Sequence, residues 1–395
     1  MKRFWGFILT ILITFSFFSL PSISETKEEQ NAVYLYCLNI GKADCMILSY
    51  QDQHYLIDTG YAHTYPALET ALKMLNIDRL NGVFITHCHK DHTGGLMQLA
   101  KSNIAIDAIY ASDIYYDVKE TKHPAVLAAR ERNMNISFLK TGDVVSLGGD
   151  AVFTVLGPVQ TNTENENNNS LVMRFSSPEG SILFAGDMKT EEEYDLLSRN
   201  LLEKSDVLKC SHHGDDGATS AALLQVVRPR HALILTSTFE EKDTPATATL
   251  ARLKSAGCTV HISQNMDDAL AVKLEDGQIS VYNATWSALP MRTTGLRCSL
   301  SRSNDTLTLT NTTDITITLS GCYLYSSRGE DVFSLPDFVI PAKESIVIGS
   351  KSTDGYTDIT LDKKNVWHDK KRDMAMLYDA FGRLLCQTDN GLKEE

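Results

Sequence analysis

The chain has 395 residues and a formal net charge of −13. A chain of this length can bury at least one large hydrophobic core and is long enough for two domains. Strong non-specific binding to nucleic acid depends on neutralising phosphates with Lys and Arg, so the acidic balance argues against it; a phosphate substrate at a cationic metal site is not excluded.

The first residues are typical of an export signal. Two basic residues precede an apolar run over residues 4–20, and small residues at positions 22 and 24 suit cleavage by a signal peptidase. We expect residues 1–24 to be a signal peptide, so that the protein is secreted or lies at the cell surface. The alternative is an uncleaved membrane anchor, because the apolar run is slightly long for a signal.

Strand and helix patterns then alternate as far as about residue 283. Strands are expected at 33–38, 46–49, 54–58, 82–86, 105–110, 152–156, 170–176, 181–185, 206–210, 231–236, 259–263, 269–274 and 279–282. Helices are expected at 67–75, 95–101, 124–132, 191–203, 219–227 and 246–256. The polar tract at 161–169 has no apolar face and should be a loop. Such alternation predicts layers of sheet and helix.

The character of the chain changes near residues 286–294. Helical periodicity ends there, and one strand pattern follows another, as in "TLTLTNTTDITITL" and "FVIPAKESIVIGS". This pattern predicts a separate all-β domain, most simply a sandwich. The fold class expected for the whole chain is α+β.

The eight cysteines show no spacing typical of a small disulfide scaffold. Cys37 and Cys45 are the pair best placed to form a bridge, provided that they face each other across a hairpin. Otherwise the cysteines act as small buried apolar residues.

The stretch "ITHCHKDHTGG" at residues 85–95 follows a buried strand and is rich in metal-ligating side chains. On an extended backbone His87 and His89 point to the same side, where both imidazoles can bind one metal ion. Asp91 and His92, beyond the bend of the chain, can serve a second metal close by. The two glycines that follow allow a tight turn into a helix.

Two later segments place further ligands at the ends of predicted strands. "SILFAGDMK" puts Asp187 at one strand end, where its carboxylate can bridge two metals or cap a helix. "SDVLKCSHHGDDG" puts His212 and His213 at another. Histidines and carboxylates at three strand ends on one rim indicate a dinuclear metal site.

This combination of motifs resembles the metallo-β-lactamase superfamily. Within it the chain is similar to ComEC-type competence hydrolase domains, on the segments "NIGKAD" (39–44), "NNSLVMRF" (168–175), "LFAGD" and "DVLKCSHHG". The resemblance implies an αββα sandwich over residues 32–285 with two divalent metal ions, zinc or manganese, at one edge.

The resemblance also implies roles for single residues. His87 and His89 would hold the first metal, while Asp91, His92 and one of His212 or His213 would hold the second. Asp187 would bridge the two metals, and Asp91 and Asp187 would be the catalytic carboxylates. Asp44 and Asp58 would lie behind the metals and orient their ligands. Apart from the resemblance, Lys42, Asn169, Ser170 and Lys209 lie in segments near the predicted site and are candidates for contacts to the substrate.

One departure concerns the first metal. Many members of the superfamily supply a third histidine there, yet no His occurs between His123 and His212 in this chain. The first site is therefore either open or filled by polar groups of residues 168–170.

Residues 293–388 resemble a lamin-tail-type domain, a small immunoglobulin-like sandwich. The resemblance rests on "LTLTNTTDITITLSGCYLYSSRG", "FSLPDFVIPAKESIVI" and "VWHDKKRDMAMLYDAFGRLL", with Cys322 at a position where Trp is common. It implies an appendage that binds a cell-surface or envelope partner.

The function expected from these features is that of an exported dinuclear hydrolase, a phosphodiesterase or nuclease in which metal-bound hydroxide is the nucleophile. DNA is a possible substrate. One alternative keeps the site and changes the substrate to cell-envelope phosphoesters, a lactone or a β-lactam. Another is a non-catalytic surface binding protein.

Overall fold

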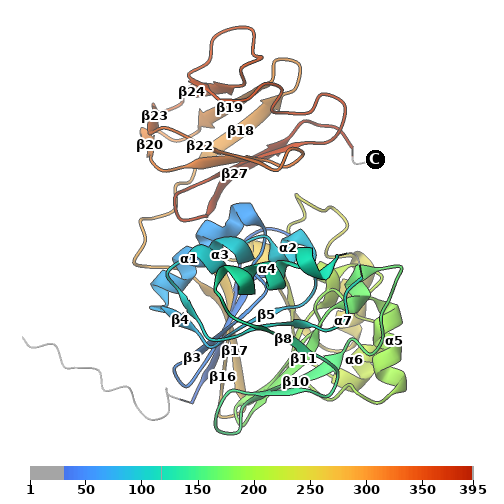
Figure 1. Ribbon diagram of the computed structural model, residues 1–395. Coiled ribbons are helices and arrows are strands. Elements are labelled where there is room, and N and C mark those ends of the chain that lie inside the picture. The colour runs from blue at the N-terminus through green and yellow to red at the C-terminus, as the bar shows by residue number, and fades with distance from the viewer. Residues whose placement is uncertain (1–30, 117, 394–395) are drawn as a thin grey trace, which may run out of the picture.

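The computed structural model describes residues 31–116 and 118–393 (Figure 1). The signal peptide predicted for residues 1–24 lies outside these ranges. Within them, no helix is both long enough and apolar enough to cross a membrane.

Two large sheets form the centre of the first domain. The first has the strand order β17 (Gln278–Ala284), β16 (Ala269–Glu275), β1 (Val33–Leu38), β2 (Met46–Tyr50), β3 (Gln53–Ile57), β5 (Gly82–Ile85), β7 (Ile109–Ser112) and β8 (Ile136–Leu139). The second has the order β15 (Thr259–Ile262), β14 (His231–Ile234), β13 (Val207–Lys209), β12 (Gly180–Phe184), β11 (Val172–Ser177), β10 (Val152–Gly157) and β9 (Val144–Ser146).

Helices cover the outer face of each sheet. The first sheet is covered by α1 (Tyr65–Met74), α3 (Leu96–Lys101) and α4 (Pro124–Glu131), and the short helix α2 (Lys90–Thr93) lies at its edge. The second sheet is covered by α5 (Thr190–Ser198), α6 (Ala221–Val227) and α7 (Thr247–Ser255). Smaller elements complete the domain: the strand pair β4 (Arg79–Leu80) and β6 (Ala105–Ile106), and the 3-10 helices η1 (Ala62–Thr64), η2 (Glu120–Lys122), η3 (Glu166–Asn169), η4 (Ser211–Gly214) and η5 (Ser263–Asn265).

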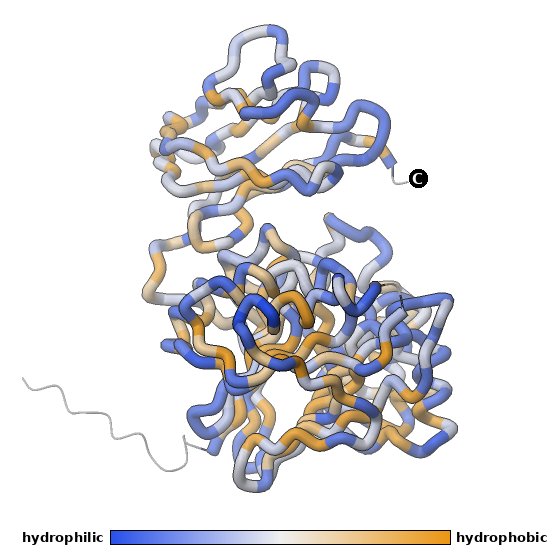
Figure 2. The backbone as a smooth tube through the Cα atoms, viewed as in Figure 1, coloured by the Kyte–Doolittle hydropathy of each residue, from blue (hydrophilic) through white to orange (hydrophobic). Residues whose placement is uncertain are grey.

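Three apolar cores hold these four layers together. The core between the sheets joins side chains of both, among them Leu35 and Phe84 from the first and Phe153 and Phe184 from the second. A second core lies between the first sheet and its helices, and a third lies between the second sheet and α5–α7. The apolar segments run through the interior in Figure 2. This is the αββα sandwich that the sequence predicted.

Each sheet has a parallel half, and these halves position the site. In the first sheet β3, β5, β7 and β8 are parallel neighbours, and in the second β12, β13, β14 and β15 are. Ligands in sheets of this kind bind beyond the carboxyl ends of parallel strands. The chain leaves β5, β12 and β13 at such ends, immediately before the three predicted ligand segments.

The second domain consists of strands alone. One four-stranded sheet has the order β18 (Leu296–Ser301), β19 (Thr306–Asn311), β24 (Ser345–Gly349) and β25 (Ile359–Thr360); the other has β22 (Asp331–Ser334), β21 (Tyr323–Ser326), β26 (Met374–Tyr378) and β27 (Leu384–Asp389). A two-stranded sheet pairs β20 (Ile317–Leu319) with β23 (Phe338–Ile340). Buried residues of these sheets, with Trp367, form one separate core. The α+β class is confirmed.

Some local expectations were wrong. The helix predicted over 191–203 ends at Ser198, and the chain turns away at Asn200, which has a left-handed φ of 55°. The polar tract at 161–169 ends in the 3-10 helix η3, whose residues are all buried. The short strands β8 and β9 were not predicted.

The bridge considered between Cys37 and Cys45 is absent, and neither of these two cysteines forms a disulfide. Cys37 lies opposite Met46 in the β1–β2 pair and points into the core between the sheets, whereas Cys45 points into the core beneath the helices. Because neighbouring positions along a strand face opposite sides of a sheet, this register keeps the two sulfurs apart.

Candidate metal centre

The first ligand segment leaves β5 at Ile85 and enters α2 at Lys90. His87 and His92 are buried, and His89 and Asp91 are half-buried. Nε2 of His87 lies 3.0 Å from Nδ1 of His89, so these two ring nitrogens face each other at hydrogen-bonding distance. Their binding of one metal stays a prediction.

Asp187 follows β12 through Gly186, which has a φ of 53°. Glycine is needed at position 186, because a Cβ there would lie 2.7 Å from the Cβ of Ser170. The Asp187 backbone N–H donates to Ser170 Oγ at 3.0 Å. The turn and this hydrogen bond fix a carboxylate that is 1 % exposed at the meeting point of the two sheets.

The histidine pair follows β13 in the 3-10 helix η4. His212 and His213 both have left-handed backbone angles, with φ values of 46° and 54°. Side chains of neighbouring residues normally diverge, yet here both Nε2 atoms face Asp187, at 3.8 Å from its Oδ2 for His212 and 3.5 Å for His213.

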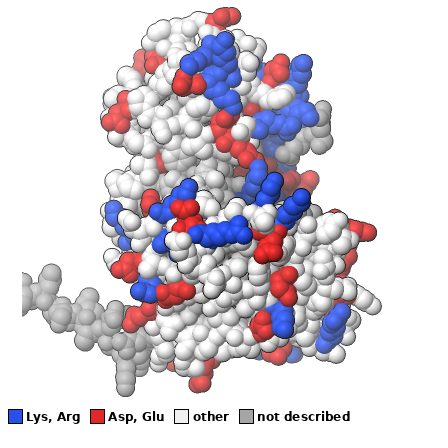
Figure 3. Space-filling model, viewed as in Figure 1, with Lys and Arg blue, Asp and Glu red and all other residues white. Residues whose placement is uncertain are grey.

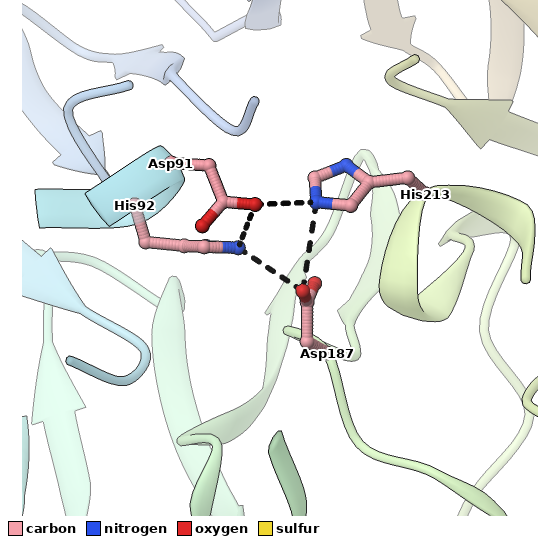
Figure 4. A group of neighbouring side chains, drawn as sticks. All are labelled: Asp91, His92, Asp187 and His213. Atoms are coloured by element: carbon pink, nitrogen blue, oxygen red, sulfur yellow. Dashed lines mark ion pairs between the residues drawn. The ribbon is translucent and has the colours of Figure 1, made fainter. Parts of the chain in front are cut away.

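Oδ2 of Asp187 is the centre of the site. Four imidazole Nε2 atoms surround this one oxygen, at 3.2 Å (His92), 3.5 Å (His213), 3.8 Å (His212) and 4.0 Å (His87). Asp91 closes the group on one side, with its Oδ2 at 3.3 Å from His213 Nε2 and 3.9 Å from His92 Nε2 (Figure 4).

These distances fit a metal ion. Two ligands of one tetrahedral zinc ion, bound at ~2.0–2.1 Å, lie about 3.4 Å apart. The ligand atoms of Asp91, His92, Asp187 and His213 all lie within 4.8 Å of one another. Among the described residues, Nε2 of His92, Nε2 of His213 and Oδ1 of Asp187 are buried without a hydrogen-bond partner. Buried polar atoms are seldom left unpaired, so the donor set fits a bound cation.

The electrostatics agree with this fit. Burial alone would lower the pKa of His92, but the carboxylates of Asp187, Asp58 and Asp91 outweigh burial and raise that pKa well above its usual value. Burial alone would also lower the pKa of His213, but Asp187 and Asp91 outweigh burial and raise that pKa to about 9. Without a metal, the carboxylates therefore hold protons on the imidazoles of His92 and His213, whereas burial lowers the pKa of His87 and His212. A divalent cation would take the place of those positive charges.

Two ligands are oriented from behind. Asp58 Oδ2 accepts from His92 Nδ1 at 2.7 Å and from Thr86 Oγ1 at 2.7 Å. His213 Nδ1 must carry a hydrogen, because it lies 2.8 Å from the Leu235 carbonyl oxygen, which can only accept. Each ring therefore presents its Nε2 to the site, an arrangement that metal-binding histidines commonly have. Asp58 therefore contacts His92, and its role in orienting a metal ligand stays a prediction.

A buried ion pair lies beneath the site and was not predicted as such. Lys209 Nζ contacts Asp44 Oδ2, and both side chains are fully buried. Lys209 Nζ also lies 3.8 Å from Asp187 Oδ1. The only signal for this pair in the sequence was a lysine inside the apolar strand pattern "DVLKC".

The residues expected to contact substrate lie in different positions. Ser170, Asn169 and Lys209 are completely buried, and their polar groups bind other parts of the protein, so they lie behind the site. Their predicted contact with substrate is not favoured by this placement. Lys42 is half-buried, with its backbone N–H donating to Glu240 Oε2 at 3.2 Å, and its contact with substrate stays a prediction.

Residues 39–238 match the sequence model of the metallo-beta-lactamase superfamily. The chain belongs to this superfamily.

Curated relatives of this superfamily member include competence proteins. The chain is 28% identical over 240 residues to ComE operon protein 3 of Bacillus subtilis (strain 168), covering 56% of this chain and 30% of that protein. It is 23% identical over 272 residues to competence protein ComA of Neisseria gonorrhoeae, covering 67% and 36%. It thus spans about a third of the length of these relatives. The resemblance to ComEC-like hydrolase domains is confirmed.

Solved structures with a similar fold include CmlA, a diiron β-hydroxylase from Streptomyces venezuelae, at a TM-score of 0.44 and 14% identity, covering 62% of this chain and 54% of that one. The MIM-2 metallo-β-lactamase matches at a TM-score of 0.36 and 16% identity, covering 56% and 86%.

Proposed function

We propose that this superfamily member is an exported hydrolase that uses two divalent metal ions to cleave phosphodiesters, and that it acts as a nuclease. The observation that supports this most directly is the ring of four imidazole nitrogens around Asp187 Oδ2. One carboxylate oxygen with so many imidazole nitrogens around it suits a bridge between two cations.

The chain's own residues divide the work. Asp91, His92 and His213 would hold one metal, His87 and His89 the other, and Asp187 would bridge them. Two such metals lower the pKa of a water nucleophile and stabilise the attacking and leaving oxygens of the substrate. Asp58 and the Leu235 carbonyl keep two rings in the orientation that binding needs. Zinc suits the imidazoles, and the carboxylates make manganese the alternative.

The choice of phosphodiesters rests on relatives and on charge. The relatives carry names that refer to competence and, for a Haemophilus influenzae protein 24% identical over 220 residues, to recombination, which favours DNA as the polymer. A net charge of −13 would repel a polyanion from most of the surface, so the metals would supply the local positive potential. The lamin-tail-like domain at 293–388 would bind an envelope partner.

The test uses the full-length protein. Bound metal is measured, and hydrolysis is followed with bis-p-nitrophenyl phosphate, single-stranded DNA, double-stranded DNA and nitrocefin. We expect metal-dependent turnover of the phosphodiesters. Asp187→Ala should lower kcat by at least about a hundredfold, because even groups that only orient a ligand contribute 10–100-fold. Asp314→Ala, at an exposed carboxylate of the second domain, is the matched control.

Other results would change the conclusion. Turnover of nitrocefin alone would make the protein a β-lactamase. Absence of both metal and turnover would favour a surface binding protein without catalysis.

A further inference from the structure

His212 could bind a metal, but the proposed function assigns it to neither of the two metals. Its imidazole Nε2 lies 3.8 Å from Asp187 Oδ2, nearly as close as His213 Nε2 at 3.5 Å. The two rings are separate, with centroids 6.0 Å apart and planes inclined by 46°. They therefore approach Asp187 from different directions.

The neighbours of His213 and His212 indicate which of the two metals each histidine would bind. His213 Nε2 lies 3.3 Å from Asp91 Oδ2 and shares a mutually close group with Asp91, His92 and Asp187. That group already has four members, which is the usual number for zinc. His212 is outside it. The other site has only His87 and His89 besides the bridging Asp187, so it is the one with an open position.

The His212 ring stands between two carboxylates, with Asp187 in front and Asp215 behind. Asp215 Oδ2 lies 3.7 Å from His212 Nδ1, too far for a hydrogen bond, and Nδ1 is buried without a hydrogen-bond partner. The amide Nδ2 of Asn167 lies 3.4 Å from Nε2, on the side that faces the site.

The backbone supports a functional reason for this position. Two consecutive non-glycine residues in left-handed conformations are unfavourable, and such strain persists where function requires it. With His212 at φ 46° and His213 at φ 54°, adjacent side chains converge on one carboxylate oxygen.

We propose that His212 is a ligand of the first metal, together with His87, His89 and Asp187, while His213 belongs to the second. Each of the two adjacent histidines thus serves a different metal. This assignment rests on the proposed dinuclear function and deepens it, because it gives the first metal a complete set of four protein ligands.

The experiment measures metal binding and needs no substrate. The full-length protein is stripped with a chelator and titrated with Co²⁺, whose visible absorption reports ligand number, and zinc content is measured in parallel. The native protein should bind two ions. His212→Ala and His213→Ala should each bind one ion tightly, with affinity for the other reduced at least tenfold. His261→Ala, a half-buried histidine far along the chain in β15, is the control and should bind two.

Double variants decide the assignment. Mutations that act on the same metal do not add, whereas mutations on different metals do. His87→Ala with His212→Ala should still bind one ion, and His212→Ala with His213→Ala should bind none tightly. Circular dichroism confirms that each variant is folded. His212→Gly provides a second variant for position 212, since glycine accepts the left-handed backbone.

Three results would overturn the proposal. If His212→Ala and His212→Gly bind two ions with native affinity, His212 is no ligand, although the dinuclear function stands. If the variant lacking both His212 and His213 keeps one tight ion, both histidines serve the same metal. If the native protein binds no metal, the proposed function fails as well.

Discussion

At the scale of single residues, the histidine pair is where local preference and function conflict most clearly. His212 and His213 occupy left-handed backbone angles. Such angles cost a residue with a Cβ about 1–2 kcal/mol. The motif "SHHG" predicted metal ligands, but it could not show which ring points inward, because ring direction depends on these backbone angles.

This conflict leads to a prediction for His212→Gly. Glycine removes the unfavourable left-handed angle at φ 46°, so the free energy of unfolding of the metal-free protein should rise by about 1 kcal/mol. Urea denaturation in the presence of a chelator measures this. In saturating zinc the order should reverse, since the variant lacks a ligand that stabilises the folded state. A variant less stable than the native protein in both conditions would contradict the strain argument.

The raised pKa of His213 gives a prediction for pH. Burial lowers the pKa of His213, but the carboxylates of Asp187 and Asp91 outweigh the effect of burial. In the folded metal-free protein the pKa of His213 is therefore raised to about 9. The unfolded value is about 6.5. The folded state therefore binds the proton more tightly, and the stabilisation is complete below pH 6.5 and lost as pH rises through 9.

We expect the contribution of His213 to the free energy of unfolding of the metal-free protein to fall by on the order of 3 kcal/mol between pH 6.5 and 9.5. His213→Gln should remove this contribution and leave that of His92, whose pKa is also raised, and a slope unchanged by the substitution would assign the effect to other groups. Zinc affinity should change in the opposite sense and increase with pH, because protons must leave before the metal binds.

At the scale of elements, the buried pair of Lys209 and Asp44 connects the two sheets under the site. Lys209 is the last residue of β13 in the second sheet, and Asp44 precedes β2 of the first. Asp44 also lies 3.5 Å from His213 Nδ1. The ion pair thus connects the packing of the two sheets with the position of His213. The positive charge of Lys209 also compensates the buried carboxylate of Asp44, which would otherwise be unpaired.

Lys209→Met tests this connection. Removing one partner of a buried ion pair leaves an uncompensated charge and destabilises a protein by ~3–5 kcal/mol. We expect a loss of this size in urea denaturation, and recovery of most of it in the double variant Lys209→Met/Asp44→Asn. A loss below about 1 kcal/mol, or no recovery in the double variant, would show that the pair does not hold the sheets together.

The elements also show how far the sequence alone could be interpreted. Strands such as β5 and β14 were predicted nearly to the residue, because buried strands give uninterrupted apolar runs with clear ends. The segment η3 was predicted as a loop because its residues are polar. It is buried nonetheless, since its side chains bind one another: Asn169 Nδ2, for example, donates to Glu166 Oε2 at 2.8 Å. Such pairing depends on tertiary contacts and leaves no periodic pattern.

At the scale of the whole molecule, the second domain packs beside the candidate metal site. His63 stacks on Tyr325 with ring centroids 3.6 Å apart, and Tyr323 donates to the His63 carbonyl oxygen at 2.8 Å. Lys90, next to Asp91 in sequence, pairs with Glu330 at 2.7 Å. In Figure 3, Lys and Arg side chains interleave with Asp and Glu where the two domains meet. The second domain therefore contacts the part of the first domain that carries the predicted ligand Asp91.

Gly382 offers a test of this packing with a closely matched control. It has a φ of 79°, and a Cβ there would lie 2.3 Å from the backbone nitrogen of Ala67 in the first domain. Gly391 has a similar φ of 73° in the same domain, with nothing within 4 Å of such a Cβ. Alanine at either position introduces the same backbone strain of about 1–2 kcal/mol, but only Gly382→Ala adds a clash between the domains.

We expect Gly391→Ala to lower the free energy of unfolding by that strain alone. Gly382→Ala should lower it further, and it should speed proteolytic cleavage in the segment 285–295, which joins β17 to β18 without a helix or strand. Backbone nitrogen cannot move aside as a flexible side chain could, so the domains must separate to admit the methyl group. Equal stability and equal cleavage rates in the two variants would show that the domains do not depend on this contact, and that the second domain is free to move relative to the metal site.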